Sequence, residues 1–183
     1  MKIRCHWMQG TKRSLPDVWL NDADIIAKKL GVQHYKVKLA PQIFIGANPA
    51  MVLPDDTILI NPKIVSVTDT ARQYVLAHEF GHVRHRHGKK ALLIFLLLCA
   101  LIPLSLVAYD FLAGLYIALR IMPHGLGEHA EYQADAVAFE ALGSPLAVIQ
   151  AQQELLHAVN GRADGPRVRR WIRLTTLSEK AQE

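Results

Sequence analysis

The stretch DTARQYVLAHEFGHVRHRHG, residues 69–88, decides how this chain folds. Thr68 or Asp69 can cap the start of a helix, and Gly88 can end it. The stretch therefore predicts one long helix. The rest of the sequence has to be arranged around it.

Residues 78–82 of this helix read HEFGH. Positions four apart lie on the same helical face, so His78 and His82 can direct ring nitrogens at one ion. Catalytic zinc sites use three protein ligands and keep one position open. Glu79 lies beside the first ligand, where its carboxylate can act as general base toward a water that the metal activates. Gly81 leaves room for a substrate or for a second helix.

A third ligand is expected in EYQAD, residues 131–135. Glu131 is the candidate, with Glu128 and His129 as nearby alternatives. Asp135 follows four residues later on the same helical face, where it can accept the second ring N–H of a ligating histidine, here His78. A solvated acidic helix face is the competing interpretation of this pair.

His85 and His87 follow the motif closely but are two residues apart, so they diverge on a continuous helix. We interpret them as part of a basic run rather than as ligands. That run also contains Arg84, Arg86, Lys89 and Lys90.

HEFGHVRHRHG, a hydrophobic block and then EYQADAVA resemble, in this order, a family of membrane zinc metallopeptidases. The family includes the CAAX prenyl proteases and the HtpX-type quality-control proteases, and the resemblance covers residues 40–145. It implies a gluzincin site with one zinc ion bound by His78, His82 and Glu131. Glu79 would be catalytic and Asp135 would be the orienting aspartate. The substrate would bind as an added strand near residues 46–61.

The sequence departs from the family's pattern near its C-terminus. Relatives often carry a His-Pro element followed by an arginine, whereas here Gly165-Pro166 precedes Arg170. Arg170 and His157 are the candidates for stabilising the transition state. For both, a solvated basic helix face is the alternative. Larger relatives also carry membrane spans before the motif helix, and none is visible here.

The remaining patterns predict an α+β fold in a single domain, residues 1–183. Helix spacing covers residues 17–30 and stops at Gly31, and a second helical pattern covers residues 128–142 and ends at Gly143. Ser144-Pro145 begins a helix that runs to about Val159. Three β-rich runs, VQHYKVKLA, QIFIG and TILIN, predict a small antiparallel sheet within residues 32–61. Pro166 opens a last, basic helix.

Between the two metal motifs lies a hydrophobic block, residues 91–122, interrupted by Pro103, Asp110 and Arg120. His82 and Glu131 must reach the same ion, so the block crosses a membrane twice or not at all. Two full spans need about 40 residues, more than the block offers. We therefore expect an inserted helical hairpin that dips into or thinly spans the bilayer and contacts lipid, with a buried soluble hairpin as the alternative.

Charge and cysteine content indicate where the chain works. Basic residues flank the hydrophobic block, which favours a catalytic domain on the cytoplasmic side of the cell membrane, the inner membrane in a bacterium. Cys5 and Cys99 form no disulfide framework, which favours a reducing compartment. The polar N-terminus shows no signal peptide.

These observations predict a membrane-associated zinc endopeptidase. Two alternatives stay open: a soluble zinc peptidase of the ImmA/IrrE type, which typically lacks such an insertion, and a non-catalytic, membrane-tethered binding protein. Nucleic acid is not expected as a partner. The net charge is +5, but no helix-turn-helix or zinc-finger spacing accompanies it.

Overall fold

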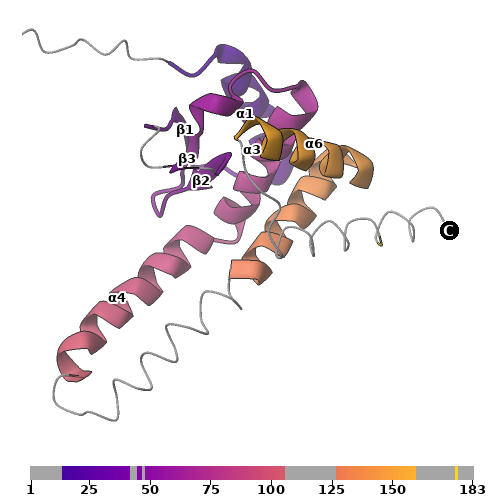
Figure 1. Cartoon of the computed structure of the whole chain (residues 1–183). Coiled ribbons are helices and arrows are strands. Elements are labelled where there is room, and N and C mark those ends of the chain that lie inside the picture. The colour runs from indigo at the N-terminus through magenta and orange to yellow at the C-terminus, as the bar shows by residue number, and fades with distance from the viewer. Residues whose placement is uncertain (1–13, 42–44, 47, 106–126, 160–175, 177–183) are drawn as a thin grey trace, which may run out of the picture.

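The computed structural model describes residues 14–41, 45–46, 48–105, 127–159 and 176. Helices and a small sheet make up the body of the described part, which confirms the α+β class. The body contains α1 (Asp17–Leu30), α3 (Asp69–Arg84), α6 (Pro145–Ala158) and a helix over residues 127–142. From this body α4 (His87–Ser105) projects outward (Figure 1). The single domain over residues 1–183 stays a prediction.

Helix ends follow the capping signals in the sequence. Gly31 follows α1 in the left-handed conformation, with φ at 71°, and its N–H bonds to the last carbonyls of that helix. Gly143 ends the helix over residues 127–142 with the same φ. Ser144 caps α6 by accepting a hydrogen bond from the N–H of Ala147. These predicted boundaries are confirmed.

The sheet is mixed, so the predicted all-antiparallel sheet is wrong in one pairing. Its strands are β1 (Lys36–Leu39), β2 (Ala50–Val52) and β3 (Thr57–Ile60), in the order β1-β3-β2. β2 pairs antiparallel with β3, and β1 pairs parallel with it. The chain leaves β1 and returns on the far side of the sheet, which places β3 in the centre.

The predicted strand QIFIG is the source of this error. Residues 42–44 lie outside the described residues, and Ile45 and Gly46 form helix and turn instead of strand. The side-chain amide of Asn61 donates to the carbonyls of Gly46 and Asn48. These hydrogen bonds hold the connection between β1 and β2 against the end of β3. The third strand is β2, which the sequence patterns did not predict.

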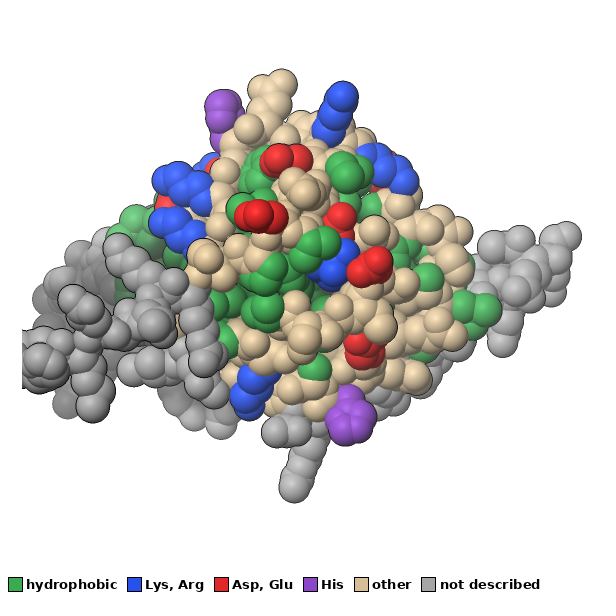
Figure 2. Space-filling view, turned by 90° about the horizontal axis from the view of Figure 1, so that it is seen from above, with side chains coloured by type: hydrophobic (Ala, Val, Ile, Leu, Met, Phe, Trp, Pro, Cys, Tyr) green, Lys and Arg blue, Asp and Glu red, His purple; other side chains and the backbone are tan. Residues whose placement is uncertain are grey.

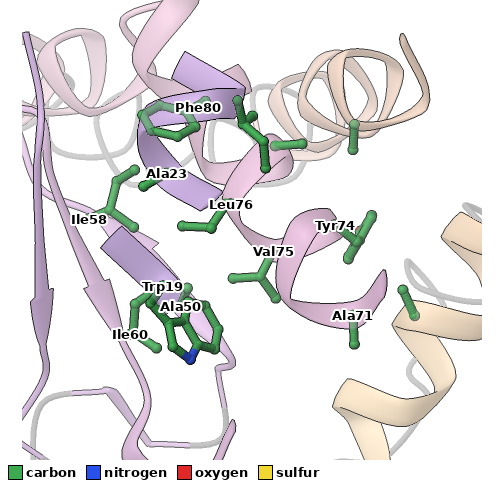
Figure 3. Close-up of a cluster of buried hydrophobic side chains, with 14 of the residues drawn as sticks. Trp19, Ala23, Ala50, Ile58, Ile60, Ala71, Tyr74, Val75, Leu76 and Phe80 are labelled. Carbon is green, nitrogen blue, oxygen red and sulfur yellow. The ribbon is translucent and has the colours of Figure 1, made fainter. Parts of the chain in front are cut away.

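The core forms on two sides of α3 (Figure 3). Leu76 is fully buried and faces Ile58 and Ile60 of the sheet, while Ala71 and Tyr74 face α6. Trp19 of α1 is also fully buried, and its indole N–H donates to the carbonyl of Val65, in the segment that leads from η1 (Pro62–Ile64) to α3. A helix packed on both sides cannot rotate or slide, so the residues of HEFGH are held in place.

α3 ends earlier than predicted. The helix stops at Arg84, His85 caps it, and α4 begins at His87. Arg86 between them has a positive φ of 55°, a conformation that turns the chain and cannot continue a right-handed helix. The single helix predicted up to Gly88 is therefore two helices.

Among the described residues, no helix is both long and apolar enough to cross a bilayer. Residues 106–126, which include the second half of the predicted hairpin, lie outside the described residues. The hairpin over residues 91–122 therefore stays a prediction. On the described part of α4, four large apolar side chains are exposed, those of Leu92, Leu93, Phe95 and Leu96.

Charged side chains are mixed on the face of the molecule in Figure 2. Lysine and arginine side chains alternate there with acidic and apolar ones. The basic side chains that give the sequence its net charge of +5 do not form a single patch on this face.

Candidate metal centre

Two helices bring three potential ligands together. His78 and His82 lie on consecutive turns of α3, and Glu131 lies on the helix over residues 127–142. Their ligand atoms all lie within 4.8 Å of one another. The two Nε2 atoms are 3.2 Å apart, and each is 3.5 Å from an oxygen of Glu131.

These separations fit a tetrahedral zinc site. Zinc binds imidazole nitrogen and carboxylate oxygen at about 2.0–2.2 Å, so two ligand atoms of one tetrahedron lie roughly 3.3–3.5 Å apart. The donor set also fits, because two imidazoles and one carboxylate are typical of catalytic zinc sites. Each histidine faces a different oxygen of Glu131, so the carboxylate would have to turn to bring one oxygen to an ion that both histidines bind.

The close approach of the two helices depends on Gly81. A Cβ atom on Gly81 would lie 2.7 Å from the Cα of Ala134 and 3.2 Å from its Cβ. The backbones can touch only because one position has no side chain and the other has a methyl group. Of the two uses that the sequence suggested for Gly81, the structure shows the second helix.

His78 is held from behind by a buried hydrogen-bond network. Its Nδ1 lies 2.9 Å from Oδ1 of Asp135, which is 3 % exposed. The same oxygen accepts from the hydroxyl of Tyr74 at 2.8 Å and from the amide of Gln152 at 3.3 Å, and Gln152 also donates to Tyr74 at 2.7 Å. Asp135 thus keeps Nδ1 of His78 protonated and leaves Nε2 free for a metal. The sequence pointed to Asp135 but gave no sign of Tyr74 or Gln152.

The carboxylates of Asp135 and Glu131 make the centre attractive to a cation in spite of its burial. Burial lowers the pKa of His78, but the hydrogen bonds and charges of Asp135 and Glu131 outweigh it and raise that pKa to about 10. Burial and the charge on His78 lower the pKa of His82 to about 3. Without a metal, His78 is therefore protonated on both ring nitrogens near neutral pH, and its positive charge lies between the carboxylates of Asp135 and Glu131. A divalent ion bound by the three side chains would replace the proton on Nε2.

Glu79 is buried beside the first histidine, with 6 % of its surface exposed. Burial raises its pKa to about 7, with His78 opposing the shift and Glu131 adding to it. A carboxylate with a pKa near the working pH can both take up and release a proton, as a general base in hydrolysis must do.

His87, which the sequence analysis placed in a basic run, contacts the metal centre, although it is not one of its three ligands. Its Nδ1 lies 2.9 Å from Nδ1 of His82. On one continuous helix, as predicted, His85 and His87 would diverge from each other. The break at Arg86 turns His87 back toward α3.

The other candidate residues lie elsewhere. Among the described residues, Glu131 and neither Glu128 nor His129 joins the histidine pair. His157 is exposed on α6, away from the face that carries the buried Gln152 and Leu155. Arg170 lies outside the described residues. The catalytic and ligand roles themselves stay predictions.

Comparison with known proteins decides the family. The sequence profile of peptidase family M48 matches residues 24–174, which include both HEFGH and EYQAD. The chain belongs to peptidase family M48. This M48 chain is therefore a member of a family of metal-dependent peptidases that usually bind zinc. No curated protein and no solved structure matches it.

Proposed function

We propose that this M48 chain is a zinc-dependent endopeptidase that works at a membrane. The observation that carries the proposal is the convergence of His78, His82 and Glu131 within 4.8 Å of one another. The buried Glu79 lies next to the first of them in the chain. These four side chains are the minimum set for hydrolysis assisted by one metal ion.

Each side chain has a separate task in this proposal. A zinc ion held by the three ligands would supply Lewis acidity toward a peptide carbonyl and a water molecule. Glu79 takes the proton of the attacking water and delivers it to the leaving amine. Asp135 keeps His78 in the tautomer that leaves Nε2 unprotonated. Arg170, as a group that stabilises the transition state, stays a candidate from sequence alone.

The peptide substrate is proposed to bind along β2. β3 is paired on both sides, so among the described residues of the predicted segment 46–61 it is β2 that has an edge available for an added strand. The N–H of Leu53 and the carbonyl of Pro49 point toward β3. Because backbone groups alternate along a strand, those of Ala50 and Val52 point outward. An extended peptide could pair there with little demand on its side chains.

Membrane association is proposed through residues 91–122. The exposed apolar side chains of Leu92, Leu93, Phe95 and Leu96 support it, because such a group on a projecting helix favours contact with lipid or protein. The exposed Lys90 lies at the base of this group and suits contact with lipid headgroups. By the positive-inside tendency the catalytic body would face the cytoplasm.

The test is metal analysis together with cleavage of casein by the full-length chain. The wild type should contain one zinc per chain and cleave. Glu79→Gln should keep the zinc and lose cleavage, because only the proton acceptor changes. Glu131→Ala should lose both.

The same experiment separates a peptidase from a binding protein that retains the motif. For a binding protein, the Glu79→Gln substitution would change nothing in any assay. Residual cleavage by Glu79→Gln near the wild-type rate would overturn the proposed mechanism. A wild type that binds no zinc would overturn the proposed metal centre.

A further inference from the structure

His82 starts a chain of hydrogen bonds that leads away from the metal centre. Nδ1 of His82 lies 2.9 Å from Nδ1 of His87, and Nε2 of His87 lies 2.9 Å from Oε1 of Gln133. Nε2 of Gln133 lies in turn 3.0 Å from Nε2 of His129, an exposed residue. This series of hydrogen bonds therefore leads from a partly buried ligand to the surface.

When a metal is bound, these hydrogen bonds can have only one direction of donation, from His82 outward. Nε2 of His82 faces Glu131 and His78, so metal binding there leaves the proton of His82 on Nδ1. That N–H must be a donor, and Nδ1 of His87 must accept it. His87 then carries its own proton on Nε2, which donates to Oε1 of Gln133. The amide nitrogen of Gln133 donates to His129.

The same arrangement ties three helices together. His82 lies on α3, His87 begins α4, and Gln133 lies on the helix over residues 127–142. The first turn of α4 also packs closely against the turn between β2 and β3. A Cβ atom on Gly88 would lie 3.1 Å from the carbonyl oxygen of Leu53, and Lys89 pairs with Asp56.

We infer that His87 is a positioning residue for the metal ligand His82. His87 accepts the Nδ1 proton of His82, as Asp135 accepts that of His78. Unlike Asp135, His87 is neutral, and Gln133 sets its tautomer. It also links the metal centre to the placement of α4, because His87 is the first residue of that helix. The inference rests on the ligand role proposed for His82.

The decisive experiment compares two substitutions of His87 in the full-length chain. His87→Leu fills the space but removes the acceptor, whereas the side-chain oxygen of His87→Asn can occupy the position of Nδ1 and accept. The zinc dissociation constant is measured by competition with a chromophoric chelator. We expect His87→Leu to weaken zinc binding by about 10–100-fold, the usual cost of losing the partner of a ligating histidine. His87→Asn should stay within about threefold of the wild type.

The partner of His87 offers a second, independent pair. Gln133→Met removes the acceptor that fixes the tautomer of His87, and Gln133→Glu keeps it. Gln133→Met should weaken zinc binding and Gln133→Glu should not. His34→Leu is the matched control, because it removes an exposed imidazole that takes no part in these hydrogen bonds and should leave the affinity unchanged.

Two spectroscopic readouts separate positioning from a loss of packing. In the zinc-loaded wild type, ¹⁵N NMR should show His82 protonated on Nδ1 and His87 protonated on Nε2. The visible spectrum of the cobalt-substituted protein should change in His87→Leu and be restored in His87→Asn.

Equal zinc affinity of His87→Leu and wild type would overturn the inference, as would a loss in His87→Asn as large as that in His87→Leu. A wild type that binds no zinc would instead overturn the proposed function itself, so the two failures are distinguishable. Should His87→Leu fail to fold, the Gln133 pair and the tautomer of His87 in the wild type decide the question.

Discussion

Glu154 on α6 clamps Thr68 at the start of α3. Its two carboxylate oxygens accept from the backbone N–H of Thr68 at 2.8 Å and from its hydroxyl at 2.6 Å. The same hydroxyl accepts from the N–H of Ala71 and so caps α3. The helix that carries His78 is thereby fixed at its start by a residue from the far end of the described chain.

The first prediction concerns this clamp. Glu154→Ala should lower the free energy of unfolding by roughly 1 kcal/mol, the usual worth of a helix cap, because the hydroxyl of Thr68 loses its orientation. The melting temperature should fall by about 2–4 °C. Thermal unfolding measures this. Gln153→Ala, a change at the neighbouring exposed position, serves as control, and an equal loss in both variants would contradict the role of Glu154.

The second prediction concerns the contact between Gly81 and Ala134. Gly81→Ala places a Cβ atom 2.7 Å from backbone, so the two helices must separate. We expect a loss of about 1–3 kcal/mol of stability and zinc binding weakened by more than tenfold, because Glu131 moves with its helix. Gly127→Ala is the control, since its Cβ would meet nothing within 4 Å. Unchanged zinc affinity in Gly81→Ala would show that the approach of the helices does not set the ligand geometry.

The third prediction concerns pH. In the metal-free protein the pKa of His78 is raised to about 10 and that of His82 is lowered to about 3. Near neutral pH, zinc must therefore displace one proton, from His78. Apparent zinc affinity should rise about tenfold per pH unit as pH increases toward 10. Proton release in weak buffer, measured during titration with zinc, checks the count. Binding independent of pH between 6 and 9 would contradict it.

The raised pKa of His78 also has a consequence for the metal-free fold. A group whose pKa is higher in the folded state than in the unfolded state stabilises the fold below its unfolded pKa. That contribution disappears as pH rises through the folded value. For His78 the loss extends from about 6.5 to about 10. Asp135→Asn should reduce this part of the pH dependence, which chemical denaturation at several pH values measures.

The fourth prediction concerns the edge of β2. Val52→Pro removes a backbone N–H that points away from β3, so the sheet should tolerate it. If the substrate pairs with this edge, KM for an unstructured peptide should rise while zinc content stays the same. Met51→Pro is the contrasting variant, because the backbone of Met51 faces β3 and its N–H supports the sheet. An unchanged KM in Val52→Pro would place the substrate elsewhere.

Local signals in the sequence predicted well wherever one residue type determines the backbone. Gly31, Gly143 and Ser144 marked helix ends correctly because a left-handed residue or a capping hydroxyl acts within one turn. The spacing of His78 and His82 predicted a shared face for the same reason.

Features that depend on packing could not be predicted from one sequence. β1 pairs parallel with β3 because the connection between β1 and β2, held by Asn61, crosses to the other side of β3. No strand pattern in the sequence encodes such a connection. The break at Arg86 requires a left-handed arginine, whereas glycine or asparagine normally marks such a turn. That break is why His87 was assigned to a basic run although it contacts His82.

Gly81 has a last consequence for the long excursion of the chain between the two ligand helices. From His82 to Glu131 the chain runs 49 residues (131 − 82) and returns to within 3.5 Å of where it left. The backbone contact between Gly81 and Ala134 joins the two ends of this 49-residue segment. A protease nick within the excursion should therefore leave two fragments that remain associated, with all three ligands still facing one another.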